Sequence, residues 1–141
     1  MTVACANEAV TRDQARECGT LLEAVGEVMW IDDERLMDAV TAVSGSGPAY
    51  VFLLAECLAE AGRAAGLDPE LSRRLARATV EGAGELLRRS DLSPQELREK
   101  VTSPKGTTAA ALEVLMGKDG MRELLARAVA AAAKRSKELS S

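Results

Sequence analysis

The sequence contains no histidine and almost no aromatic side chains. Its 141 residues include one Trp, one Tyr and one Phe, at Trp30, Tyr50 and Phe52. The lack of imidazole excludes catalytic triads, proton relays and metal sites that need histidine, and we expect no metal site. Basic residues are also too few for nucleic acid: 18 Lys and Arg against 22 Asp and Glu give a net charge of −4. We therefore expect no nucleic-acid partner.

Cysteine and long apolar runs are scarce too. Cys5, Cys18 and Cys57 are widely spaced and odd in number. This argues against a disulfide framework or a zinc site and favours a reducing, cytoplasmic location. The longest apolar stretch, 48–55, ends at Glu56, well short of the about 18 residues of a transmembrane helix. We expect neither a signal peptide nor a membrane partner.

Residues 1–31 read differently from the rest of the chain. Their pattern predicts strand–helix–strand over about 2–6, 12–25 and 28–31, with Thr11 capping the helix. Two short strands make no stable sheet by themselves. We expect this segment to be the end of a larger α/β domain.

From residue 32 onward every predicted element is a helix, so the fold class is mainly α. Capping residues, prolines and glycines place the helices at about 33–43, 46–65, 69–89, 94–101, 107–116 and 121–138, with a break at 44–47. The helix at 46–65 is apolar nearly all round in its first half, which is typical of a helix buried on most sides. We expect self-association to cover it, a compact monomeric bundle being the alternative.

Two short segments invite a functional interpretation and do not support it strongly. Gly45-Ser46-Gly47 fails the dinucleotide fingerprint because Tyr50 stands where the third glycine belongs. It is either a turn feeding a proline-started helix or a place where a ligand approaches the backbone. The adjacent acids at 32–34 diverge, which predicts a solvated helix start rather than a metal site.

The loop 101–108, VTSPKGTT, gathers four hydroxyls, one lysine and one glycine immediately before a helix. A helix N-terminus offers free N–H groups and partial positive charge, which suit a carboxylate or a phosphate. Ser and Thr are also common helix caps, and Pro-Lys-Gly is a common turn, so an ordinary turn remains the alternative.

Longer segments carry a more specific signal. Residues 38–52, DAVTAVSGSGPAYVF, and the loop 101–108 with the following ALEVL closely resemble the C-terminal domain of pyrroline-5-carboxylate reductase. Residues 21–26 and 28–32 resemble the end of that family's nucleotide-binding domain. The resemblance covers essentially the whole chain, in order and spacing.

The resemblance implies an enzyme that reduces 1-pyrroline-5-carboxylate to L-proline with NADPH or NADH, in proline biosynthesis. Residues 1–31 would be the remnant of its Rossmann domain. Residues 32–141 would be an all-α dimerisation and substrate-binding domain, a helical bundle that interlocks with its twin. In this family dimers often assemble into larger rings.

Carried over by position, the substrate-binding residues are Ser103, Gly106, Thr107 and Thr108. Thr108 matches the catalytic threonine whose hydroxyl hydrogen-bonds the ring nitrogen. A cyclic imine protonates readily, so hydride addition needs little help from a general acid, and a site without histidine is consistent with this chemistry.

The chain departs from the family pattern in two respects. The family usually has glycine where this chain has Lys105, which carries a strain cost if the position needs a positive φ. The glycine-rich nucleotide-binding motif is missing, so we expect the chain to be inactive alone. The alternatives are a non-catalytic dimerisation module and a reductase for another imine or keto acid.

Overall fold

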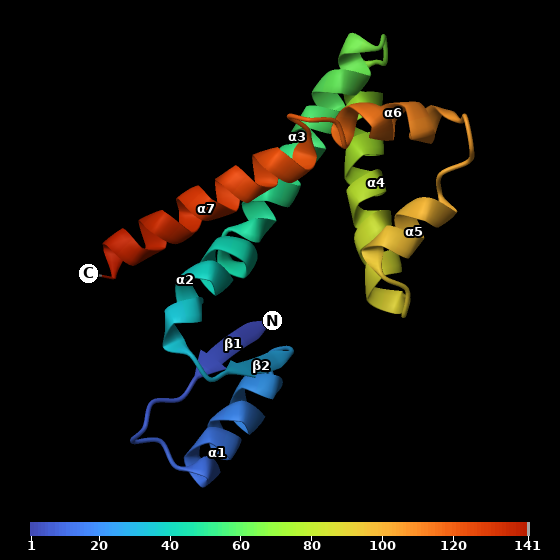
Figure 1. Ribbon diagram of the computed structural model, residues 1–141. Coiled ribbons are helices and arrows are strands. Elements are labelled where there is room, and N and C mark those ends of the chain that lie inside the picture. The colour runs from blue at the N-terminus through green and yellow to red at the C-terminus, as the bar shows by residue number, and fades with distance from the viewer. Residues whose placement is uncertain (141) are drawn as a thin grey trace. The chain divides into compact units, whose positions relative to one another are not determined.

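The computed structural model describes residues 1–140 (Figure 1). The chain divides into two units, Met1–Gly47 together with the residues from Ala128 onward, and Pro48–Arg127. Each unit is built from short-range elements whose boundaries follow local sequence signals, and each is described by itself below.

The first unit begins with a strand–helix–strand element. β1 (Thr2–Cys5) and β2 (Val28–Ile31) pair in parallel, and α1 (Arg12–Glu23) joins them. The cap of α1 is reciprocal, because the Thr11 side chain accepts from the backbone of Gln14 and the Gln14 side chain accepts from the backbone of Thr11. The predicted strand–helix–strand pattern is confirmed.

The next segment corrects the sequence prediction of a break at 44–47. After a 3₁₀ turn at Glu34–Leu36, the chain winds through α2 (Met37–Val40) and a π-helix, η2 (Thr41–Gly45), into α3 (Gly47–Ala64). The Ser46 N–H donates to the Thr41 carbonyl at 2.9 Å, so helical winding continues. The proline after Gly47 has no N–H and crowds the preceding turn, which favours this wider turn.

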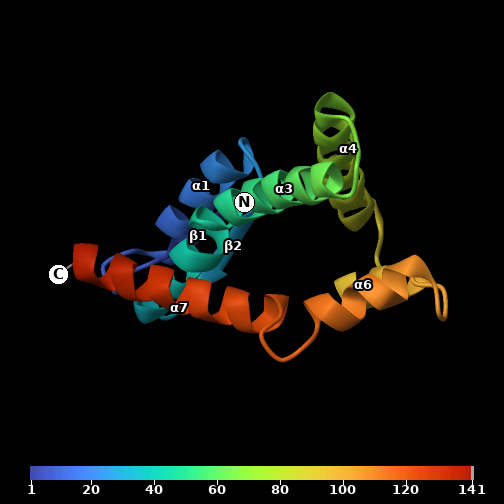
Figure 2. The ribbon, with the colours of Figure 1, turned by 90° about the horizontal axis from the view of Figure 1, so that it is seen from above.

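The second unit holds most of α3, α4 (Pro69–Arg89), α5 (Pro94–Lys100), α6 (Thr107–Leu115) and the start of α7 (Met121–Leu139). α3 and α4 meet in a tight hairpin, the green turn in Figures 1 and 2. Gly66 lies there at a φ of 99°, and the Leu67 N–H donates to the Gly62 carbonyl at 3.1 Å. This is a Schellman ending, which needs a residue free to adopt positive φ. Asp68 then caps α4 through the N–H groups of its first turn.

Small residues let α3 and α4 approach closely. The buried Ser72 hydroxyl donates to the Ala59 carbonyl at 2.6 Å. A Cβ placed on Gly62 would clash with that hydroxyl oxygen, and Ala76 is also buried along α4. The contact between these helices therefore depends on positions 59, 62, 72 and 76 remaining small.

Large apolar side chains stay uncovered by the chain itself. No Leu, Ile, Val, Met or Phe among residues 1–140 is buried. On α3, the helix expected to be covered on most sides, Phe52 is 66% exposed and Leu53 58% exposed. Large apolar surfaces that a chain does not bury itself mark sites of contact with another surface. With 47% hydrophobic residues, this chain is expected to have such a contact.

By length and composition alone, the helical segment 34–64 contains an 18-residue stretch apolar enough to cross a membrane. The sequence prediction concerned uncharged runs of about 18 residues, whereas this criterion admits charged residues, so that prediction is not contradicted. A core helix covered by protein meets the same criterion, so the measure does not separate a lipid surface from a protein partner.

Candidate functional site

The loop before α6 contains a strained residue. Ser103 to Gly106 form a turn in which the Gly106 N–H donates to the Ser103 carbonyl at 3.0 Å. Lys105, at the third position of that turn, has a φ of 60° and is the one non-glycine residue with positive φ in the part of the chain described. Type II turns require positive φ at this position and favour glycine or asparagine there. The positive φ on which the expected strain cost at Lys105 depends is therefore present.

The N-terminus of α6 differs from those of α1, α4 and α5. Those three helices are capped by the side chains of Thr11, Asp68 and Ser93. The N-cap of α6 is Gly106, and no side chain accepts from its first turn. The first N–H groups of α6 therefore remain available to a ligand, beside the exposed Ser103 and Thr107 hydroxyls.

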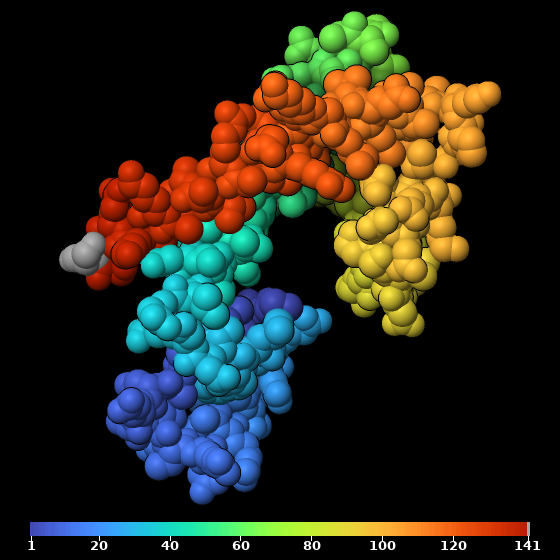
Figure 3. Space-filling model, in the orientation of Figure 1, coloured from blue at the N-terminus to red at the C-terminus, as the bar shows by residue number. Residues whose placement is uncertain are grey.

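Thr108 is half-buried and lines an apolar groove of about 370 Å³ between α4, α5 and α6. The groove lies within the second unit. In the space-filling view of Figure 3, α5 is coloured gold and α6 orange. Its lining residues are Ala83, Leu86, Leu87, Pro94, Leu97, Arg98, Val101, Thr108 and Leu112. The geometry places one predicted site residue, Thr108, in a groove and leaves Ser103 and Thr107 at its loop, exposed.

The sequence analysis did not consider Arg98, which also lines the groove. It is the charged member of the groove lining and the one half-buried cation among residues 1–140. The sequence does contain a signal. The residues of this segment that line the groove, at 94, 97, 98 and 101, have helical spacing. Position 98 is an arginine within this otherwise apolar face.

Two acids with lowered pKa values, one in each unit, have ordinary structural roles. In α5 the Ser93 hydroxyl and N–H donate to Glu96 at 2.7 and 2.8 Å, and these bonds hold the pKa of Glu96 below its usual 4.5. The Asp33 carboxylate accepts from the Arg35 side chain at 2.9 Å, which lowers the pKa of Asp33. No cluster of three metal-binding side chains occurs among the residues described.

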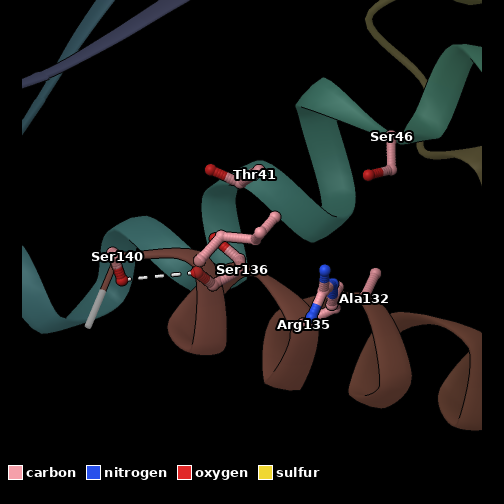
Figure 4. Close-up of a pocket in the computed structure, with 7 residues that line it drawn as sticks. Thr41, Ser46, Ala132, Arg135, Ser136 and Ser140 are labelled. Atoms are coloured by element: carbon pink, nitrogen blue, oxygen red, sulfur yellow. Dashed lines mark hydrogen bonds between the residues drawn. The ribbon is translucent and has the colours of Figure 1, made fainter.

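A second hollow lies in the first unit, between η2 and the end of α7 (Figure 4). Hydroxyls of Thr41, Ser46 and Ser136 face it, together with Arg135. Arg135 is already paired with Glu138 at 3.2 Å, and the carbonyl end of a helix repels anions. Because Arg135 is already paired, it is not available to bind a charged ligand in this hollow.

Among the residues described, the turn after β1 is not a glycine-rich loop of the kind that binds a dinucleotide. The turn between β1 and α1 carries Ala6, Asn7 and Glu8 rather than glycines, and Glu8 would repel a pyrophosphate. The first turn of α1 is occupied by its own cap, Thr11. NADPH or NADH therefore does not fit these residues by themselves.

A family model for the pyrroline-5-carboxylate reductase dimerisation domain matches residues 34–139. The chain belongs to this family. Similar curated proteins include pyrroline-5-carboxylate reductases of Pseudomonas aeruginosa and Synechocystis sp., each 47% identical. The alignments cover 95% and 99% of this chain but 49% and 51% of those proteins, so the chain spans about half the length of the curated relatives it matches.

Solved structures agree with the family. A pyrroline-5-carboxylate reductase of Coxiella burnetii matches 99% of this chain and 51% of its own, with a TM-score of 0.90 and 42% identity. A pyrroline carboxylate reductase of Plasmodium falciparum, with NADP bound, matches 99% and 53% with a TM-score of 0.82 and 35% identity. The mainly helical fold with a short parallel β-α-β element is thus that of the matching half of these solved pyrroline-5-carboxylate reductases.

Family membership gives the exposed apolar residues of α3 a role. The matched domain is a dimerisation domain, and α3 lies wholly inside it. An apolar helix that its own chain leaves open is what a homodimer interface buries. The expectation that a partner chain covers this helix agrees with the family.

Proposed function

We propose that this chain is the dimerisation and substrate-binding part of a pyrroline-5-carboxylate reductase, which reduces 1-pyrroline-5-carboxylate to L-proline. The observation that carries the proposal is the family match over 34–139 together with the placement of Thr108 in a groove beside the uncapped start of α6. The proposal keeps residues 1–31 as the end of a nucleotide-binding domain and 32–141 as the helical domain.

The roles of the loop residues follow from their chemistry. The hydroxyl of Thr108 would hydrogen-bond the ring nitrogen and orient the imine carbon. Ser103, Gly106 and Thr107 would hold the carboxylate side of the substrate with hydroxyl and N–H donors at the start of α6. Apolar groove residues such as Leu112 would pack against the ring carbons.

The reduction also needs a hydride, which the side chains of this chain do not supply. We propose that the donor, NADPH or NADH, is held by a nucleotide-binding part, and the NADP in the Plasmodium falciparum structure supports this assignment. A cytoplasmic location belongs to the same proposal, and the free state of all three cysteines supports it. Assembly of homodimers into a larger ring is a further part of it.

The experiment joins this chain to the nucleotide-binding half of a relative and follows NADPH oxidation with 1-pyrroline-5-carboxylate. Turnover that depends on both halves, with none from this chain alone, supports the proposal. A folded, dimeric hybrid without turnover contradicts it and favours a non-catalytic dimerisation module. Turnover with a larger cyclic imine or a keto acid, and none with 1-pyrroline-5-carboxylate, would assign a different substrate.

A further inference from the structure

The second unit has almost no hydrophobic core of its own. Within Pro48–Arg127, every residue of which the structure describes, the buried side chains are Ala59, Ser72 and Ala76. Side chains this small remove little apolar surface from water when they are buried. Ordering the backbone of the unit costs conformational entropy, and so small a core does not offset that cost.

Helix α3 shows the lack of cover most clearly. From position 51 onward, its residues that are not exposed are Ala55, Ala59 and Gly62, whose spacing places them on one narrow face. This face meets α4, because the Ser72 hydroxyl bonds the Ala59 carbonyl and leaves no room for a Cβ on Gly62. Large apolar side chains on the remaining faces stay exposed: Val51, Phe52, Leu53, Leu54 and Leu58.

These exposed side chains need cover from more than one direction. Residues 51–54 are consecutive, and successive residues of an α-helix point about 100° apart, so one flat neighbouring surface does not reach all four. Of the 26 large apolar residues that are exposed in the part described, 20 lie within 34–139, the match to the dimerisation domain. The dimerisation domain itself is therefore uncovered, and not only the strand–helix–strand element before it.

The surface area of the chain leads to the same conclusion. The chain exposes 11309 Å². A folded monomer of 14.9 kDa exposes about 7,000 Å², and two separate compact bodies with the sizes of the two units would expose about 8,400 Å². The excess over the larger value is about 2,900 Å², well above the roughly 800 Å² that each partner buries in a standard interface and on the scale of obligate homodimers.

We propose that this chain has no stable folded monomer, and that folding and dimerisation are a single transition in which a second copy supplies the missing core. The matched family assigns a dimerisation domain to 34–139, and the second copy is therefore the surface that completes it. The loop 101–108 lies in the same unit, so the proposed substrate site also forms only on assembly. This inference goes beyond the proposed function and does not depend on the reaction.

The test follows helicity by circular dichroism and mass by sedimentation, on the full chain at 1 and 100 µM. In urea, the helical signal and the dimer should be lost together. The thermal midpoint should rise by about 5 °C between the two concentrations, because mass action favours a dimer that forms from unfolded chains. An unchanged midpoint, or a 14.9 kDa species that keeps its helical signal, overturns the proposal.

Two variants sharpen this test. Phe52 is 66% exposed and Leu21, on α1, is 75% exposed, so a glutamate at either position would cost a self-sufficient monomer little. Phe52→Glu should release a 14.9 kDa species that has lost most of its helical signal. Leu21→Glu is the matched control and should behave like the unchanged chain. A helical monomer from Phe52→Glu overturns the proposal.

Subunit exchange decides the matter if unfolding is irreversible. Chains with and without ¹⁵N are mixed, and mixed dimers are followed by native mass spectrometry. They should form no faster than helicity is lost after transfer into urea, extrapolated to zero urea. Faster exchange reveals a folded monomer and overturns the proposal, as does a chain that lacks helicity even at 100 µM. The proposed function is tested separately, by turnover of the joined halves, and stands or falls on that result.

Discussion

The hydroxyl of Ser72 and the carbonyl of Ala59 are joined by a 2.6 Å hydrogen bond that ties α4 to α3. The bond is possible because Gly62, one turn along α3, leaves the hydroxyl room. Polar groups buried at a helix contact are retained when they are paired, and this one is. The close approach of these helices sets the position of α4, which forms one wall of the groove.

Gly62→Ala should destabilise the protein by about 1–3 kcal/mol, because the new methyl displaces the Ser72 hydroxyl from its acceptor. Gly82→Ala is the control, since a Cβ at Gly82 in α4 meets nothing within 4 Å. It should stabilise the protein by about 0.5–1 kcal/mol through helix propensity. Urea unfolding at one fixed protein concentration measures both, and equal effects would refute the close contact.

Lys105→Asn should raise the stability of the protein by about 0.5–1 kcal/mol, because asparagine tolerates the left-handed conformation at lower cost. Lys105→Val should lower stability by about 1 kcal/mol, because a β-branched side chain tolerates it least. Lys118→Asn provides the surface control. Thermal unfolding distinguishes these cases, and a stabilising valine would show that position 105 does not hold a positive φ.

In a complete reductase, Thr108→Val should lower kcat/KM by about 10- to 100-fold, the range expected for loss of one hydrogen bond to a charged ring nitrogen. Thr108→Ser keeps the hydroxyl and should retain most of the activity. Steady-state kinetics with 1-pyrroline-5-carboxylate measure the effect. Equal kinetics for Thr108→Val and the unchanged enzyme would remove Thr108 from the site.

The capping box of α5 should contribute to the acid sensitivity of the fold. The pKa of Glu96 is lowered in the folded chain, so its stabilising effect is complete above its unfolded pKa and is lost as pH falls through the lower folded value. Glu96→Gln should therefore flatten the loss of stability below about pH 5. Glu113→Gln, at an exposed position of α6, is the control, and identical pH profiles for both variants would contradict this role.

Most helix boundaries could be predicted because the signals that set them are local. Asp68 with Pro69 and Ser93 with Glu96 mark helix starts wherever the rest of the chain goes, and Gly66 marks an end. The glycine-rich segment before α3 misled the prediction, since glycine there permits a turn without requiring one. Neither Gly45 nor Gly47 has a positive φ, and the π-helix leads directly into α3.

The site was predictable in part for the same reason. Thr107 and Thr108 adjoin one another in sequence, so a motif alone brings them together. Arg98 and Thr108 line one groove only because α4, α5 and α6 lie around it, which no single segment encodes. The apolar pattern of α3 predicted that a partner covers this helix, but which surface meets Phe52 cannot be read from one chain, in which Phe52 is 66% exposed.

The most direct test of the account is the mass of the assembly by sedimentation at micromolar concentration. A domain that pairs through α3 should sediment as a dimer of twice 14.9 kDa or as a multiple of that dimer. Phe52→Glu should shift it toward monomer, and Leu21→Glu, on the exposed face of α1, should not. A well-folded monomer of 14.9 kDa for the unchanged chain would contradict the account.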